Sequence, residues 1–167
     1  MIDNLSVKIE VGNIVSIVGP NGSGKSTLVK LISKEISPST GEIFFQGKNN
    51  NEWDAIDLAL NRSVLAQSSH LSFSFSVIDI IRMGFYPNEL LGATQNTHLI
   101  NKLLKVFDLD GYSERIYTTL SGGEKQRVQL ARVIAQIWSE ENLEGKLLIL
   151  DEPTSYLDIK HQLSLFE

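Results

Sequence analysis

The sequence predicts an α/β protein, a mixed sheet with helices on both faces into which an α-helical subdomain is inserted. Three observations lead to this prediction. A β-branched run at 13–18 is followed by a glycine-rich loop and by apolar residues at helical spacing as far as Ile36. From roughly residue 71 to residue 137, helical patterns follow one another without a strand between them. The continuous apolar run at 147–150 is typical of a central parallel strand.

The first part of the chain combines short strands with two helices. Alternating or clustered β-branched and aromatic residues predict strands at 5–9, 13–18, 43–45 and 62–67. The first helix follows the glycine-rich loop and is broken at 37–39, where Pro38 stands between serines. A second, short helix is expected at 53–60, after a polar turn at 46–51.

Apolar periodicity predicts three more helices, at 77–83, 98–109 and from Ser121 to about Trp138. Glycine and proline at 84–87 and 92–94 separate them. Ser121 is a good N-cap, and Glu124 three residues later completes a capping box. We therefore expect three regions: 1–70 as the first part of the core, 71–137 as the helical subdomain and the helix that Ser121 opens, and 138–167 as the return to the core.

Composition excludes several classes of function. The 167 residues suit one domain with an inserted subdomain, and a net charge of −5 argues against broad nucleic-acid binding. Without cysteine there is no disulfide, thiolate metal site or cysteine nucleophile. From its first residues we expect no signal peptide, and no apolar run in the sequence reaches membrane-spanning length. We expect a cytosolic protein, which acts at a membrane only through a partner.

The loop after residue 18 matches the phosphate-binding pattern G-x-x-x-x-G-K-[ST] in full. The matching residues are Gly19, Pro20, Asn21, Gly22, Ser23, Gly24, Lys25, Ser26 and Thr27. Glycines let successive backbone N–H groups point into one concavity, and the following helix adds the positive end of its dipole. Lys25 supplies a charge for the β- and γ-phosphates, and the Ser26 hydroxyl a ligand for Mg²⁺. A plain Gly-Ser turn is the alternative, but the complete pattern favours a nucleoside triphosphate.

Two further elements follow the phosphate loop. Residues 120–124 read Leu-Ser-Gly-Gly-Glu, and the apolar run at 147–150 ends in Asp151 and Glu152. In this order the three elements resemble those of the ATP-binding-cassette (ABC) transporter ATPases, and the resemblance spans the whole chain. It implies a P-loop NTPase core and an enzyme that binds and hydrolyses ATP with Mg²⁺.

The resemblance also assigns catalytic and metal-binding roles. It implies that Asp151 holds Mg²⁺, usually through water, opposite Ser26. It makes Glu152 the general base that polarises the attacking water, with Lys25 on the phosphates. Gln67 matches the glutamine that reaches the metal and the attacking water. Each assignment has a plainer alternative, such as strand-end solvation for the two carboxylates and an ordinary surface glutamine for Gln67.

The signature element of the family works between subunits. The resemblance implies that Ser121, Gly122 and Gly123 contact the γ-phosphate bound by the other subunit of a head-to-tail homodimer. A helix N-terminus presents backbone N–H groups suited to an anion, although an ordinary N-cap is the plainer interpretation of this serine alone. Residues 155–158 match the loop that crosses the dimer interface, with Tyr156 where alanine is commoner.

A narrower resemblance is to the ATPases of haem importers. It depends on two stretches: 64–77 together with 82–84, and 131–138 together with the polar loop that leads to Leu147. It implies transmembrane permease subunits as partners, a periplasmic or surface substrate-binding protein as an indirect partner, and a peripheral position on the cytoplasmic face of the inner membrane. The alternatives are an iron-siderophore or cobalamin importer, a soluble ABC protein acting on ribosomes or DNA, and a regulatory or inactive binding module.

Other candidate residues carry weaker signals. The three histidines, His70, His98 and His161, lack metal-ligand company and are expected on the surface. An aromatic group, Phe73, Phe75, Phe85 and Tyr86, is expected either in the core or on a partner-facing surface. The segment from Gln67 to about Gly84 is the one we expect to dock a permease.

Two features of the family are missing from these 167 residues. An adenine-stacking aromatic would lie upstream of Leu5, and a switch histidine would lie on a strand beyond Glu152. We therefore expect a chain truncated at both ends that hydrolyses ATP slowly or not at all, because positioning around the γ-phosphate dominates this reaction. A natural short form completed by another chain is the alternative.

Overall fold

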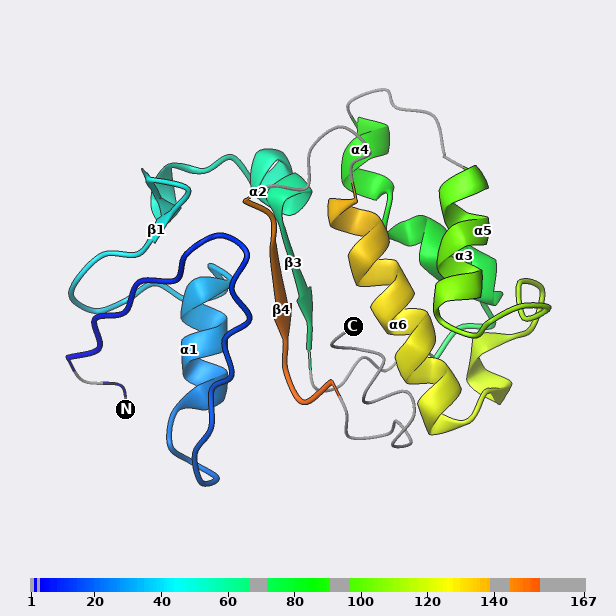
Figure 1. Cartoon of the computed structure of the whole chain (residues 1–167), viewed down its shortest axis with the longest axis horizontal. Helices are drawn as coiled ribbons and strands as arrows, with labels where there is room; N and C mark the ends of the chain where they lie inside the picture. Colours follow the sequence, from blue (N-terminus) through cyan, green and yellow to red (C-terminus); the bar gives the residue numbers. More distant parts are fainter. Residues whose placement is uncertain (1, 3, 67–71, 91–96, 139–144, 154–167) are drawn as a thin grey trace.

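The computed structural model describes residues 2, 4–66, 72–90, 97–138 and 145–153 (Figure 1). Its helices and strands are α1 (Lys25–Ile32), β1 (Phe44–Phe45), β2 (Lys48–Asn49), α2 (Ala55–Asn61), β3 (Arg62–Leu65), α3 (Val77–Met83), α4 (Tyr86–Leu90), α5 (Thr97–Val106), α6 (Gly122–Ile137) and β4 (Leu147–Leu150). Two 3₁₀ turns lie at Asn50–Glu52 and Tyr117–Thr119. The α/β class is confirmed, and α3 to α6 all fall between β3 and β4 in the chain.

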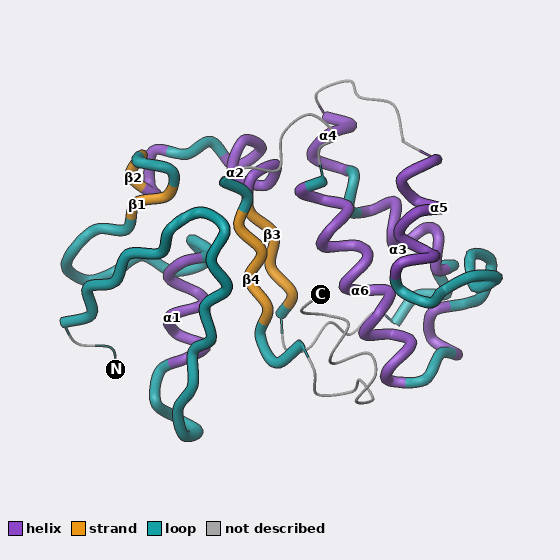
Figure 2. Tube along the Cα trace, viewed as in Figure 1, coloured by secondary structure: helices purple, strands orange, loops and turns teal. Residues whose placement is uncertain are grey.

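The described strands pair in two separate sheets (Figure 2). β3 and β4 are parallel, with Arg62 opposite Leu147 and Leu65 opposite Leu150. β1 and β2 form an antiparallel hairpin whose turn residues, Gln46 and Gly47, have φ of 50° and 75°. Two positive φ values match the type I′ turn that the twist of a hairpin favours. Of these two sheets, the parallel pair is the one that packs against the helical region, through α6.

The strands predicted at 5–9 and 13–18 are wrong: neither segment forms a strand in the structure. Their apolar side chains are exposed, to 91% for Val18, and Figure 1 shows this part of the chain running beside α1 without a neighbouring strand. The physical reason is that a strand exists only through a ladder to a partner strand. Alternating apolar and polar residues indicate which side chains would share a face of a strand. They do not indicate which strand would be the hydrogen-bonded partner.

Helix bounds differ from the predictions where the backbone turns left-handed. α1 ends at Ile32 rather than near Ile36, since Lys34 adopts a φ of 62°. α5 ends at Val106 because Asp108, at φ 50°, cannot continue a helix. The break predicted at 84–87 contains the start of α4, whose proline lies in the first turn, where the missing N–H costs nothing.

α6 packs against two different partners. One face places Val128, Ala131 and Ala135 in the main core with side chains of α3 and α5. The other face places Leu130 and Val133 against Leu65 of β3, with Leu148 and Leu150 of β4 beside them. Figure 1 shows α6 between the parallel strands on one side and α3 and α5 on the other. α6 is therefore the element that joins the strand pair to the helical region.

Polar side chains fasten the ends of the elements to one another. The buried guanidinium of Arg62 donates to the carbonyls of Ile32 and Ser33 at the end of α1, and to Asn50 Oδ1 at 3.0 Å. Desolvation lowers the pKa of Arg62, but its three acceptors satisfy the donors that burial removes from water. Gln136 on α6 donates to the carbonyls of Ala59 and Arg62 at 2.9 and 3.1 Å. These bonds set where α1 and α6 meet the start of β3.

α3 and α6 approach so closely that only glycine fits at position 84. A Cβ built on Gly84 would collide with the carbonyl oxygen of Arg132 and lie 2.9 Å from the Ala135 Cβ. The backbone conformation is not the reason, since Gly84 has ordinary helical angles, φ −61° and ψ −31°. The requirement comes from the neighbouring helix.

We expect Gly84→Ala to lower the free energy of unfolding by about 1–3 kcal/mol, the usual cost of overpacking. Alanine normally stabilises a helix relative to glycine, so a loss has to come from the α3–α6 contact. Urea unfolding of the full-length protein measures the change. Met83→Ala, at a neighbouring side chain that is 40% exposed, is the matched control. A more stable Gly84→Ala variant would show that the contact is looser than described.

Candidate nucleotide site

The phosphate loop is shaped by glycines with left-handed backbones. Gly22 has a φ of 80° and Gly24, the N-cap of α1, a φ of 99°, values that side chains other than glycine adopt only with strain. A Cβ on Gly19 would lie 2.8 Å from the Ser23 Oγ. The Ser23 amide bonds the Pro20 carbonyl at 3.3 Å and closes the turn. The loop and helix predicted from the motif are confirmed, without the strand expected before them.

Lys25 lies over this loop. Its ammonium donates to the carbonyl oxygens of Gly19 at 2.8 Å and Pro20 at 2.9 Å. The first turn of α1 contains no acidic residue, and no side chain caps its N-terminus. The lysine charge and the positive end of the helix dipole therefore act on the same place, with no carboxylate of that turn to offset them. This is the electrostatics of an anion site.

Two carboxylates follow the end of β4. The Asp151 amide donates to the Leu65 carbonyl at 2.9 Å, so pairing with β3 continues one residue past the strand. Asp151 is half-buried, whereas Glu152 is exposed and has a φ of 50°. The Gln126 side chain of α6 donates to the Pro153 carbonyl at 3.1 Å. The left-handed turn at Glu152 is thus held on both sides, by β3 before it and by α6 after it.

The capping box at the start of α6 is confirmed. The Ser121 amide donates to Glu124 Oε2 at 2.7 Å, and the Glu124 amide donates to Ser121 Oγ at 3.3 Å. Tyr112 donates its hydroxyl to Glu124 Oε1 at 2.8 Å. The bond from the Ser121 amide, then those from Tyr112 and the Ser121 side chain, lower the pKa of Glu124 to about 2. No bond made by the described residues uses the amides of Gly122 or Gly123.

Figure 1 shows these parts on the same side of the molecule, along one of its long edges. The start of α1, the C-terminal end of β4 and the start of α6 all lie toward the lower edge of the view. In open parallel sheets, nucleotides bind at the carboxyl ends of the strands. The phosphate loop and the two carboxylates lie on that side of the β3–β4 pair. Gln67, residues 155–158, His70 and His161 lie outside the described residues. Within them, no group of three or more acidic or histidine side chains could hold a metal ion.

The aromatic residues divide between core and surface. Phe85 is buried and Phe75 packs against the main core, whereas Tyr86 is exposed. Phe73 is 72% exposed, although its ring meets that of Phe75 edge-on with centroids 6.1 Å apart. The core interpretation is confirmed for Phe75 and Phe85, and a partner-facing role for the exposed Phe73 and Tyr86 stays a prediction. His98 is exposed at the start of α5.

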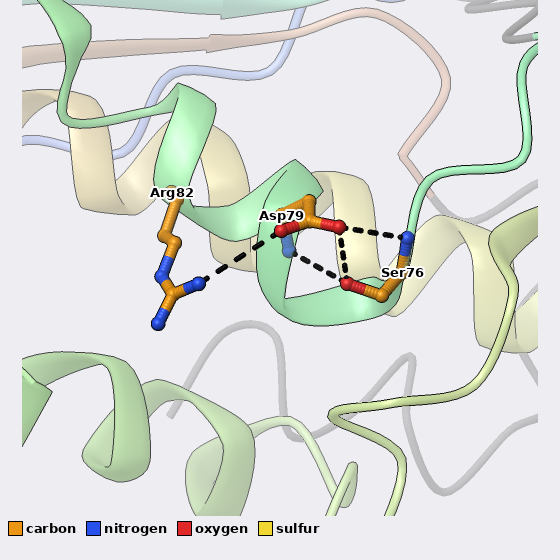
Figure 3. Close-up of polar contacts among 3 residues, drawn as sticks. All are labelled: Ser76, Asp79 and Arg82. Atoms are coloured by element: carbon orange, nitrogen blue, oxygen red, sulfur yellow. Dashed lines mark hydrogen bonds and ion pairs between the residues drawn. The ribbon is translucent and has the colours of Figure 1, made fainter.

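A second capping box starts α3 (Figure 3). Ser76 Oγ lies 2.5 Å from Asp79 Oδ2, the Asp79 amide donates back to Ser76, and Arg82 lies 3.8 Å from Asp79 Oδ1. Sequence reasoning overlooked this cap, although a serine three residues before an acidic side chain and an apolar run is its signal. Tyr112 was also overlooked, and no local pattern marks it, because its bond to Glu124 joins separate parts of the chain.

The low pKa of Glu124 predicts an acid-dependent loss of stability. Because the folded value lies near 2 and the ordinary value is 4.5, the stabilisation is complete above pH 4.5 and is lost as the pH falls toward 2. We expect Glu124→Gln to destabilise the full-length protein at about pH 6 and to differ less from wild type at about pH 3.5. Urea unfolding at both pH values measures this. Glu114→Gln makes the same charge change outside the capping box, and an equal pH effect there would contradict the assignment.

Comparison with known proteins gives the family. The model of the ABC transporter family matches residues 2–155. The hemin import ATP-binding proteins of Escherichia coli O157:H7 and Rhizobium meliloti are each 44% identical to the chain, over 98% and 99% of it and 62% and 63% of their own length. That of Gloeobacter violaceus is 41% identical over 97% of the chain and 59% of its own length. The chain thus spans about three fifths of these relatives.

Solved structures agree with this result. A putative metal-chelate type ABC transporter in an inward-facing conformation superposes with a TM-score of 0.72 at 30% identity, over 96% of this chain and 58% of that one. A bacterial Atm1-family ABC exporter with ATP bound has a TM-score of 0.70 at 24% identity, over 87% and 25%, and shows the shared fold. Among the described helices none is long and apolar enough to span a membrane. The chain belongs to the ABC transporter family, and this membership implies that it binds a nucleotide.

Proposed function

We propose that this chain is the ATP-binding and ATP-hydrolysing part of an ABC importer subunit that drives the uptake of haem. The observation that carries the ATPase role is that three elements lie on the same side of the molecule: the phosphate loop with Lys25, the carboxylates after β4, and the capped start of α6. The haem substrate is supported by the relatives at 41–44% identity, which are named hemin import ATP-binding proteins.

In this proposal the residues divide the work of phosphoryl transfer. Loop amides and Lys25 bind the β- and γ-phosphates, and Glu152 accepts a proton from the attacking water, with Gln67 orienting it. Ser26, Asp151 and Gln67 offer hydroxyl, carboxylate and amide oxygens, the hard donors that Mg²⁺ prefers. When bound, Mg²⁺ neutralises charge on the phosphate oxygens. The α1 and β4 ends that bear Ser26 and Asp151 lie on one side of the molecule, which fits a shared site.

We propose that two copies pair head to tail when ATP is bound. The start of α6 in one copy, with Ser121 and the amides of Gly122 and Gly123, then meets the γ-phosphate on the Lys25 loop of the other. A C₂ pair uses both patches twice and so encloses two nucleotides. The amides of these two glycines, which bond nothing among the described residues, are the donors that such an interface needs.

The permease is proposed to dock on the segment from Gln67 to about Gly84. Phe73, at 72% exposure, offers an apolar contact there, whereas Phe75 packs against the core that contains Val77, Ile80 and Ile81 of α3. The subunit would lie peripherally on the cytoplasmic face of the inner membrane, with a substrate-binding protein acting on the far side. We retain 1–70, 71–137 and 138–167 as proposed regions, with α6 belonging to the helical one. A metal-chelate importer is the second candidate, favoured by the structural neighbour of that type.

We expect Lys25→Ala to weaken ATP binding and Glu152→Gln to retain binding while turnover falls at least about a hundredfold. The reason is that Lys25 acts on charge present in the bound ground state, whereas Glu152 acts only on the attacking water. Titration with a fluorescent ATP analogue and phosphate release, both on full-length protein, separate the two effects. In the presence of ATP, the Glu152→Gln protein should also accumulate as a dimer, which size-exclusion chromatography detects.

The control for this pair is Glu114→Gln, a charge change on an exposed side chain outside the proposed site. Undiminished turnover in Glu152→Gln would remove Glu152 from the role of base. Unchanged binding in Lys25→Ala would contradict the phosphate loop itself.

Deleting the gene should abolish growth on haem as the sole iron source and leave growth on iron-siderophore complexes intact, since importer and substrate are matched through the permease. Complementation with wild-type protein should restore growth on haem, and Glu152→Gln should not. Growth on haem that survives deletion, with growth on a siderophore lost, would favour the metal-chelate alternative.

A further inference from the structure

The carboxylate of Glu124 has both oxygens occupied by different parts of the chain. Oε2 accepts the Ser121 amide at 2.7 Å within the capping box. Oε1 accepts the hydroxyl of Tyr112 at 2.8 Å, from a loop twelve residues earlier. A capping box needs only the first of these bonds. The second bond therefore adds a restraint on the carboxylate that the start of α6 does not itself supply.

Tyr112 belongs to a loop that is itself firmly held. Its amide donates to the Leu109 carbonyl at 3.0 Å, and its ring packs against the main core. The first amides of α3 donate into the same loop, Val77 to the Arg115 carbonyl at 2.9 Å and Ile78 to the Ser113 carbonyl at 3.0 Å. The hydroxyl of Tyr112 is thus presented to α6 from a rigid base rather than from a loose loop.

The charge on Glu124 explains why its orientation matters. A carboxylate in the first turn of α6 is drawn to the helix amides, and the amides of Gly122 and Gly123 are the ones that no bond of the described residues uses. A carboxylate turned toward them would occupy the donors that a phosphate needs and would repel it. Arg115, whose guanidinium lies 3.9 Å from the centre of the Tyr112 ring, lies close enough to offset part of that charge.

We propose that Tyr112 is a positioning residue for the start of α6: its hydroxyl holds the Glu124 carboxylate in the capping box and away from the amides of Gly122 and Gly123. The inference rests on the proposed function, in which those amides receive the γ-phosphate bound by a second copy. Tyr112 touches no substrate, and it acts through Glu124 alone. Its loss should therefore affect turnover and leave nucleotide binding at the Lys25 loop unchanged.

The test uses full-length protein and four variants: Tyr112→Phe, Glu124→Gln, the double variant, and Tyr86→Phe as a control that removes a hydroxyl from an exposed tyrosine. We expect Tyr112→Phe to lower turnover by roughly fivefold, the loss of one hydrogen bond, with affinity for a fluorescent ATP analogue unchanged. Tyr112→Phe should cause no further loss of turnover in the Glu124→Gln background, whatever the turnover of Glu124→Gln itself, because Tyr112 acts through the Glu124 carboxylate alone.

A second readout does not depend on ATP. Carbon-13 NMR of labelled glutamate should show the pKa of the Glu124 carboxyl rising from about 2 in Tyr112→Phe and unchanged in Tyr86→Phe. Wild-type turnover in Tyr112→Phe, or an equal loss in the Glu124→Gln background, would overturn the positioning role and leave the ATPase proposal intact. An inactive wild-type protein would overturn both, and the NMR result would still decide whether Tyr112 holds Glu124.

Discussion

The packing of α6 on both sides is the constraint on which the rest of the structure depends. Val128 and Ala131 belong to the core of the helical region, while Leu130 and Val133 close the core against β3 and β4. A helix buried on two faces cannot shift along its axis without breaking one of the two contacts. The position of Ser121 at its start, and of Gln126 beside the turn after β4, therefore follows from apolar packing many residues away.

The parts of the fold that were predictable from the sequence are those in which neighbours along the chain decide the structure. α3 coincides with the predicted 77–83, and Ser121 caps α6 as its spacing to Glu124 indicated. The strands at 5–9 and 13–18 were wrongly predicted, since a strand needs a partner that no local pattern names. Left-handed residues such as Lys34 and Asp108 ended helices that apolar periodicity alone would have extended.

The candidate site likewise has residues that were predictable from the sequence and residues that were not. The phosphate loop, Asp151 and Glu152 could be picked out as candidates from residue types in a fixed order, and the elements that bear them lie on the same side of the molecule. Their supports could not be identified, because the bond from Gln126 to Pro153 spans 27 residues and the one from Tyr112 to Glu124 spans 12. A sequence motif contains the residues expected to contact a ligand. The side chains that orient those residues come from distant parts of the chain and follow no local pattern.

The attachment of α1 has a mechanical consequence. None of its side chains is buried, and its carbonyl end is clamped by Arg62, with Lys34 bonded to the Trp53 carbonyl just beyond. The described bonds of Arg62 and Lys34 therefore anchor α1 at its C-terminal end, while its N-terminal end carries the phosphate loop. Since no α1 side chain is buried, a shift of that loop on binding an anion would break no contact of the buried core. Arg62 is also the first residue of β3, whose last residue accepts the Asp151 amide, so α1 and the carboxylates are attached to the two ends of one strand.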